Sequence, residues 1–200
     1  MKKKIILYCG EFDPPHMGHV CTASLALNYM QTYDKVLFVP CGVDVVGLNS
    51  VASERHIKKM LSLMLAPLSD RYFSVADFTI NMNNIKDLKN KVDLLKREYD
   101  PILLIELDQA QYIYRRRGYQ ELLKIVRFIV TNKKGHFKDP SNLLLREPNV
   151  FIKAYPYIET ISLLSLRINS SKNIFDEVID SDVADYITEK NFYNVLHRGK

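Results

Sequence analysis

KIILYCGEFDPPHMGH is the sequence of residues 4–19 in this 200-residue chain. Its apolar run Ile5–Tyr8 has the length and character of a buried strand. Pro14 and Pro15 have no amide hydrogen, so the residues after Gly10 cannot continue a central strand. A helical pattern begins near Gly18. The stretch therefore predicts a strand, a tight loop and the start of a helix, in that order.

Two histidines, His16 and His19, stand where the loop meets the helix. Free amides and the positive end of the helix dipole make a helix start favourable for an anion. Gly10 lets a ligand approach the backbone closely, and both imidazoles can donate hydrogen bonds to one phosphate. The alternative is a turn shaped by proline and glycine, with two surface histidines. Because the motif follows an apolar strand directly, we predict a site for nucleotide phosphates with no covalent nucleophile at its centre.

The spacing Gly10-x-Phe12-Asp13-Pro14-x-His16-x-Gly18-His19 resembles the signature of the HxGH nucleotidyltransferase superfamily. Within it, the nicotinamide/nicotinate mononucleotide adenylyltransferases are most similar. The resemblance implies that the phosphate of nicotinate or nicotinamide mononucleotide attacks the α-phosphorus of ATP, giving NAD or its deamido form and pyrophosphate. It implies that His16 and His19 are catalytic and that Gly10, Phe12 and Gly18 belong to the ATP site.

Five further apolar segments have the length of strands, and helical patterns stand between them. They are Lys35–Val39, Tyr72–Ala76, Pro101–Ile105, Lys124–Val130 and Asn149–Ala154. This alternation predicts an α/β fold with a mostly parallel sheet and helices on both faces, and the resemblance implies that it is Rossmann-like. We expect one domain, with the nucleotide-binding core in residues 1–150. Residues 151–200 would add the last strand, a Ser-x-x-x-x-Arg helix and the C-terminal helices.

The resemblance places further ATP contacts along the chain. Arg55, in the first turn of a helix, stands where the family has an arginine, and a solvated arginine is the alternative. Asp108, after the fourth strand, matches the aspartate that holds the nucleotide ribose, whereas Glu106 replaces a glycine. Ser162 and Arg167 match a helix start that binds the ATP phosphates in the family, and the resemblance implies that Arg167 is catalytic. The alternative for this segment is an amphipathic helix with one exposed arginine.

The mononucleotide site matches the family less well, because the chain has no tryptophan to pack on the pyridine ring. We expect Phe78, Tyr114 or Tyr119 to contact that ring, although Phe78 also suits the core. Arginines 115–117 follow Tyr114 and invite a nucleic-acid interpretation. A run this short is usually a solvated surface, which we favour.

Composition is ordinary for a globular protein, with 47% hydrophobic and 26% charged residues. The net charge of +5 suits anionic partners in general. The three cysteines lack metal-ligand spacing and indicate reduced thiols in a cytoplasmic or nuclear protein. We expect no signal peptide, because the apolar run after Met1 is short and Glu11 and Asp13 interrupt it. We also expect no membrane span, because no apolar stretch approaches the required length. We also expect no dedicated metal site, so Mg²⁺ would arrive with ATP; a homo-oligomer stays open.

Two other classes of function stay open. The same fold serves transferases with another acceptor or donor, such as phosphopantetheine or CTP. A nucleotide-sensing or RNA-binding homologue with weakened turnover would keep the phosphate site and release no pyrophosphate. The adenylyltransferase interpretation predicts a direct in-line displacement driven by positioning and electrostatics.

Overall fold

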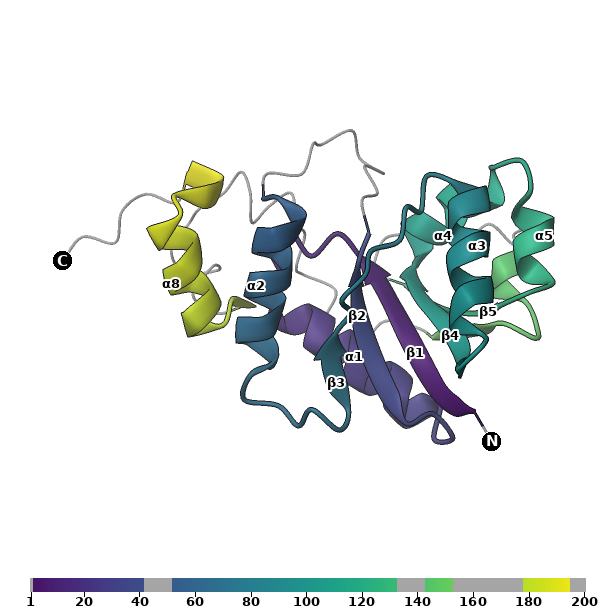
Figure 1. Cartoon of the computed structure of the whole chain (residues 1–200), viewed down its shortest axis with the longest axis horizontal. Coiled ribbons are helices and arrows are strands. Elements are labelled where there is room, and N and C mark those ends of the chain that lie inside the picture. Colours follow the sequence, from purple (N-terminus) through teal and green to yellow (C-terminus); the bar gives the residue numbers. More distant parts are fainter. Residues whose placement is uncertain (1, 42–51, 133–142, 153–177, 195–200) are drawn as a thin grey trace.

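A six-stranded sheet forms the centre of the computed structural model, which describes residues 2–41, 52–132, 143–152 and 178–194 (Figure 1). The strands are β1 (Lys3–Gly10), β2 (Lys35–Pro40), β3 (Phe73–Val75), β4 (Tyr99–Glu106), β5 (Arg127–Thr131) and β6 (Val150–Ile152). Their order in the sheet is β3-β2-β1-β4-β5-β6, and every neighbouring pair is parallel. The predicted α/β class and parallel sheet are confirmed.

Helices connect the strands and cover both faces of the sheet. They are α1 (Met17–Tyr29), α2 (Glu54–Leu65), α3 (Ile85–Leu95), α4 (Leu107–Tyr114), α5 (Tyr119–Leu123) and α8 (Ser181–Glu189), with short 3-10 turns η1 (Leu143–Leu145) and η2 (Phe192–Asn194). Figure 1 shows α1 behind the sheet, α3 to α5 on its other face, and α8 beside α2.

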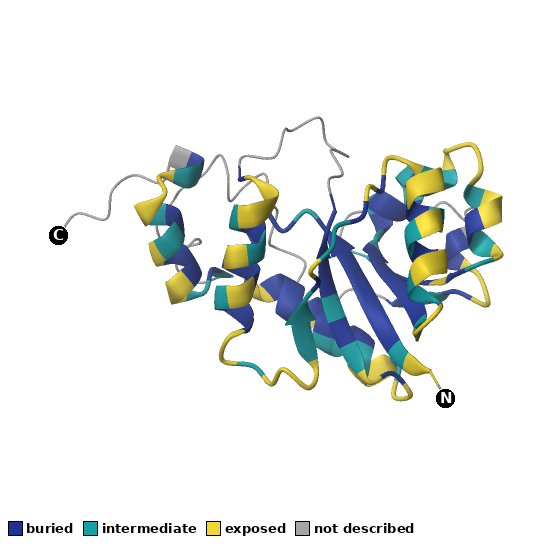
Figure 2. Ribbon diagram, in the orientation of Figure 1, coloured by how far each residue is buried: buried dark blue, intermediate teal, exposed yellow. Residues whose placement is uncertain are grey.

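Two separate cores follow from the alternation of side chains along the strands. Ile6 and Tyr8 of β1 point into a core that α1, α2 and α8 complete. Ile5, Leu7 and Cys9 point to the opposite face, into a core completed by α3, α4 and α5. Figure 2 shows the result, with buried strands between helices that expose one side. Burial on both faces explains why the strand sequences are continuously apolar.

Several strand boundaries differ from prediction by one to three residues. The fourth strand begins at Tyr99, two residues before the predicted Pro101, and the helix before it, α3, ends at Leu95. The fifth strand begins at Arg127 rather than Lys124, since α5 and its end occupy the residues before it. The sixth is described only as Val150–Ile152.

The order in which the chain adds strands to the sheet reverses between β1 and β4. The chain passes from β1 to β2 and β3 on one side, then crosses back to β4 on the other side of β1. Open α/β sheets bind ligands at the carboxyl ends of the strands at such a switch point. The helices that follow these two strands, α1 and α4, begin there on opposite faces of the sheet.

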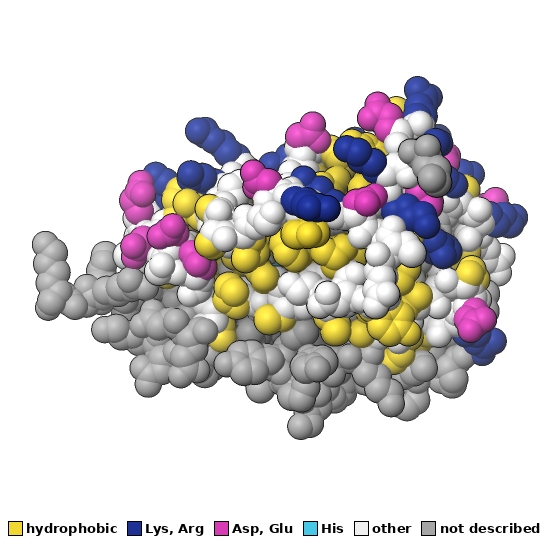
Figure 3. Space-filling view, turned by 90° about the horizontal axis from the view of Figure 1, so that it is seen from below, with side chains coloured by type: hydrophobic (Ala, Val, Ile, Leu, Met, Phe, Trp, Pro, Cys, Tyr) yellow, Lys and Arg dark blue, Asp and Glu magenta, His cyan; other side chains and the backbone are white. Residues whose placement is uncertain are grey.

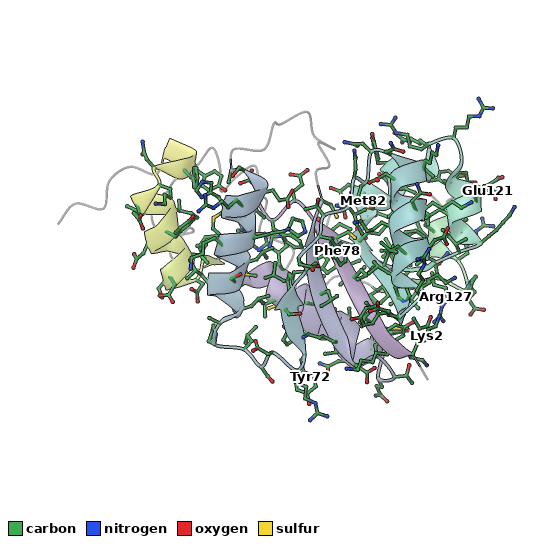
Figure 4. The ribbon with its side chains drawn as sticks, viewed as in Figure 1. Lys2, Tyr72, Phe78, Met82, Glu121 and Arg127 are labelled. Atoms are coloured by element: carbon green, nitrogen blue, oxygen red, sulfur yellow. The ribbon has the colours of Figure 1, made fainter. Side chains whose placement is uncertain are left out.

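The amino ends of the strands lie opposite to the switch point, and Figure 4 labels Lys2, Tyr72 and Arg127 at or just before three of these ends. Lys2, Lys4 and Lys96 line a pocket of about 600 Å³ there, together with Asp34 and Asp100. Figure 3, the view from below, shows basic side chains beside a band of hydrophobic ones. Part of the positive charge of the chain therefore lies at the edge opposite to the switch point.

Candidate active site

His16 and His19 come together at the start of α1, which follows β1 across the loop. The two imidazole rings are stacked, with centroids 3.7 Å apart and planes 25° apart. The backbone closes the same turn, because the His19 amide donates to the His16 carbonyl at 2.9 Å. The side chains are only 2% and 3% exposed. Both rings are therefore held in one orientation beside the first free amides of a helix.

One hydrogen bond assigns the ring proton of His19. The His16 amide donates to Nδ1 of His19 at 3.1 Å, so Nδ1 acts as an acceptor. In a neutral ring the proton then resides on Nε2, which becomes the donor. The Phe12 ring meets His19 edge-on, with centroids 5.0 Å apart. The His19 ring is thus held in a fixed direction, with Nε2 as its donor nitrogen.

Phe12 packs against this turn from the core. Its side chain is fully buried, and its φ of 51° is unusual for a residue with a bulky side chain. The ring meets Tyr8 at 5.2 Å and Phe38 at 5.6 Å, measured between centroids. The ring therefore belongs to the core beside the histidines, and the contact of Phe12 with ATP stays a prediction.

The structure also shows a packing role for Gly10, and its contact with ATP stays a prediction. A Cβ atom built on Gly10 would lie 2.8 Å from two atoms of the Phe12 ring, closer than such contacts allow. The space beside this glycine is filled by Phe12 rather than left open for a ligand. Gly18 lies in the first turn of α1, where it is buried, and its carbonyl accepts from the Thr22 hydroxyl at 2.9 Å.

Asp13 joins three segments that are far apart in the sequence. Its buried carboxylate accepts from the Ala52 amide, which lies 3.3 Å from Oδ1 and 3.4 Å from Oδ2, just before α2. Oδ1 also accepts from the hydroxyl of Tyr193, in η2. We call this set the Asp13 junction. The motif contains Asp13, but no local signal in the sequence connects it with Ala52 or Tyr193, so its structural role was not predicted.

Across the switch point, Glu106 and Asp108 begin α4. Glu106 and Gln109 form a reciprocal capping box, in which the Glu106 amide donates to Oε1 of Gln109 at 3.1 Å. The glutamate that replaces a glycine thus has a structural use. Asp108 is half-buried and accepts from the Gln109 amide at 2.8 Å. Burial raises the pKa of Tyr8 well above its usual value, and the nearby charges of Glu106 and Asp108 act in the same direction.

Arg55 lies exposed in the first turn of α2, three residues after Ala52 of the Asp13 junction. The hydrogen bond and ion pair with Glu189 raise the pKa of Lys190 at the end of α8, and the charge of Arg55 opposes this weakly. The contact of Arg55 with ATP stays a prediction. Ser162 and Arg167 lie outside the described residues.

The three aromatic residues predicted for the mononucleotide lie on the other face of the sheet from His19. Phe78 packs on the core beneath α3, with the Lys91 ammonium 5.3 Å from its ring centre, near the carboxyl ends of the central strands (Figure 4). Tyr114 and Tyr119 meet edge-on at 5.1 Å and pack on that same core. Their contact with a substrate stays a prediction. Arginines 115–117 are exposed, as expected.

Neither a metal centre nor a membrane-spanning helix occurs in the described part of the chain. No group of three or more His, Cys, Asp and Glu side chains among the described residues could hold a metal ion. No helix in the same ranges combines the length and apolar character needed to cross a membrane.

Comparison with known proteins gives one consistent group. A probable nicotinate-nucleotide adenylyltransferase of a Nitratiruptor species is 25% identical over 183 residues, covering 90% of this chain and 96% of that protein. The nicotinate-nucleotide adenylyltransferase of Bacillus subtilis is 27% identical over 196 residues, covering 96% and 98%. Plasmodium falciparum nicotinic acid mononucleotide adenylyltransferase complexed with NaAD shares the fold, with a TM-score of 0.71 at 21% identity over 96% of this chain and 98% of that one.

A family model described as cytidylyltransferase-like matches residues 7–168. The match begins inside β1 and spans the loop, the histidine pair and both sides of the switch point. This chain belongs to the cytidylyltransferase-like family.

Proposed function

We propose that the protein transfers AMP from MgATP to nicotinate mononucleotide, which forms the deamido form of NAD and releases pyrophosphate in NAD biosynthesis. The observation that carries the proposal is the stacked pair of His16 and His19 at the first turn of α1. The names of the similar proteins support this acceptor. A cytoplasmic location, where ATP and the mononucleotide are available, follows from the same proposal, and we treat residues 1–200 as one catalytic domain.

In this proposal the triphosphate lies over the start of α1. An oxygen of the mononucleotide phosphate attacks the α-phosphorus of ATP, a new P–O bond forms, and the bond to the β-phosphate oxygen breaks as pyrophosphate departs. His19 donates from Nε2 to a phosphate oxygen on which charge accumulates, and His16 lies beside it. Because these donors are already fixed, little reorganisation accompanies the reaction. No covalent intermediate with the protein is required.

Other residues complete the proposed ATP site. The amides of the first α1 turn, including that of Gly18, face the phosphates, and Asp108 accepts from the ribose. Arg55, Ser162 and Arg167 are proposed phosphate ligands, with Arg167 neutralising the leaving group. Mg²⁺ is part of the substrate here, bound by the triphosphate oxygens. Phe78, Tyr114 or Tyr119 would contact the pyridine ring.

The substrate is tested by pyrophosphate release from wild-type protein. ATP and CTP are each combined with nicotinate mononucleotide, nicotinamide mononucleotide or phosphopantetheine. We expect the highest kcat/KM with ATP and nicotinate mononucleotide, and a dinucleotide product confirmed by mass spectrometry. Faster turnover with CTP or phosphopantetheine would assign a different transferase. Nucleotide binding without any pyrophosphate release would favour a sensing or RNA-binding homologue.

The role of His19 is tested by His19→Ala. Loss of a preorganised donor to the reacting phosphates is expected to lower kcat by roughly 100- to 1,000-fold. Cys21→Ala is the matched control, because Cys21 lies exposed on the same helix and should keep wild-type turnover. A His19→Ala enzyme as active as this control removes His19 from the mechanism.

A further inference from the structure

We propose that Tyr193 is a positioning residue for the reaction proposed above. Its hydroxyl holds the Asp13 carboxylate, and through Asp13 it fixes the loop that carries His16 and His19. Tyr193 lies 180 residues beyond Asp13 in the chain. The C-terminal segment thereby determines the geometry of the phosphate site without touching a substrate.

The first support is the burial of the contact. Asp13 is fully buried and Tyr193 is 6% exposed, so the hydrogen bond between them is shielded from water. A hydroxyl that donates to a buried carboxylate makes a charge-assisted bond, stronger than one between neutral groups. The Ala52 amide also stabilises this carboxylate, but removing the tyrosine donor would take away part of the stabilisation of its charge.

The second support is backbone strain on both sides of that bond. Tyr193 has a φ of 61°, and Phe12, which directly precedes Asp13, has a φ of 51°. Residues with large side chains rarely adopt this left-handed region, and it persists only where the surroundings enforce it. The Tyr193–Asp13 contact is one such enforcing interaction. Strain of this kind is concentrated at functional sites in proteins.

The third support is the short, stiff path from Asp13 to the histidines. Only Pro14 and Pro15 separate Asp13 from His16, and each proline ring fixes its own φ. If the backbone at Asp13 moves, the two stiff proline residues therefore transmit this movement to His16. His16 in turn orients His19, through the bond from its amide to Nδ1. The second arm of the junction, the Ala52 amide, ties Asp13 to the start of α2.

The test compares two tyrosine-to-phenylalanine changes in the C-terminal segment. Tyr193→Phe removes the hydroxyl and keeps the buried ring. Tyr186→Phe removes a hydroxyl that bonds Nδ1 of His56 at 2.7 Å and holds α8 on α2. Both variants lose one hydrogen bond of the same segment, so a merely structural effect should be similar in both. We expect a Tm lowered by a few degrees in each.

Turnover should separate the two variants. Tyr193→Phe should lower kcat about tenfold while changing KM for ATP less than about threefold, because misplaced donors weaken the transition state more than substrate binding. Tyr186→Phe should keep kcat within about twofold of wild type. Equal kcat values in the two variants overturn the inference. If the wild-type protein shows no turnover in the proposed reaction, the proposed function is refuted. The positioning role of Tyr193 is then tested by a second measurement.

That second measurement is independent of activity. Side-chain ¹⁵N resonances of the five histidines are recorded by NMR for both variants. Tyr193→Phe should shift the signals of His16 and His19, and Tyr186→Phe should shift that of His56. If Tyr193→Phe leaves both motif histidines at their wild-type positions, Tyr193 does not position them, whatever its effect on Tm.

Discussion

Gly10→Ala tests the account of the motif most directly, because it adds one carbon atom at a position where the structure leaves no space. The new Cβ would lie 2.8 Å from two carbons of the Phe12 ring and 3.2 Å from a third. The clash can be relieved only if the ring moves. Yet the ring is fully buried and packed edge-on against Tyr8 and His19, so any movement disturbs the core or the histidine.

The magnitude follows from the cost of overpacking a rigid core. Inserting a methyl group into such a site destabilises a protein by about 1–3 kcal/mol. For a chain of this size, each kcal/mol corresponds to about 2–4 °C in Tm, so Gly10→Ala should lower Tm by about 2–12 °C. Because Phe12 contacts His19, we also expect kcat for pyrophosphate release to fall.

A double-mutant cycle with Phe12→Leu identifies the cause. The smaller leucine leaves room for the added methyl group, so the loss in the double variant should be smaller than the sum of the single losses by about 1 kcal/mol or more. Gly118→Ala is the control. Gly118 has a φ of 91° and only the Ile85 methyl near its Cβ position, at 3.6 Å, so its penalty comes from the backbone and should not couple to Phe12.

Chemical denaturation measures the four free energies of unfolding, and calorimetry measures ATP binding. Strictly additive losses for Gly10→Ala and Phe12→Leu would refute the steric argument. A double variant that regains stability but not ATP affinity would return Gly10 to its originally predicted role, close approach of a ligand to the backbone.

Two further predictions use the buried titratable groups. Burial raises the pKa of the Cys41 thiol well above its usual value, and the adjacent Cys9 thiol adds to this effect, whereas Cys21 is exposed. A disulfide reagent should therefore modify Cys21 quickly and the two buried thiols slowly. Cys21→Ser should remove the fast phase of this reaction. Burial likewise raises the pKa of Tyr8, so the folded protein holds this proton more tightly than the unfolded chain. The resulting stability is fully present below about pH 10 and is lost as the pH rises further. Tyr8→Phe should therefore flatten the decline of the urea midpoint above about pH 10.

The sheet could be predicted because each strand is buried on both faces. Runs such as Ile5–Tyr8 and Pro101–Ile105 are continuously apolar, and β1 and β4 include them. The parallel arrangement follows because helical segments separate the strands. Strand ends were predicted less accurately, as at Arg127, because the preceding α5 is only five residues long and gives too short a periodic pattern.

The histidine pair could also be predicted, since a local motif places both residues in one helical turn. The Asp13 junction could not, because its partners are 39 and 180 residues away and no pattern in the sequence encodes such a contact. Glu106 is intermediate. The sequence shows that a glutamate replaces the family glycine at this position. Gln109, three residues later, completes the capping-box pattern that explains the glutamate.

The motif therefore contains two kinds of residues, and their variants should fail in two ways. Gly10, Phe12 and Asp13 are buried beneath or beside the histidines and contact other parts of the protein, so their loss displaces the site and lowers Tm together with turnover. The ring edge of His19 that carries Nε2 is the part directed at chemistry in our proposal. Relative to its decrease in Tm, His19→Ala should accordingly show a larger decrease in kcat than Gly10→Ala. If Gly10→Ala instead loses more turnover relative to its loss of Tm, the main role of the histidines is structural rather than catalytic.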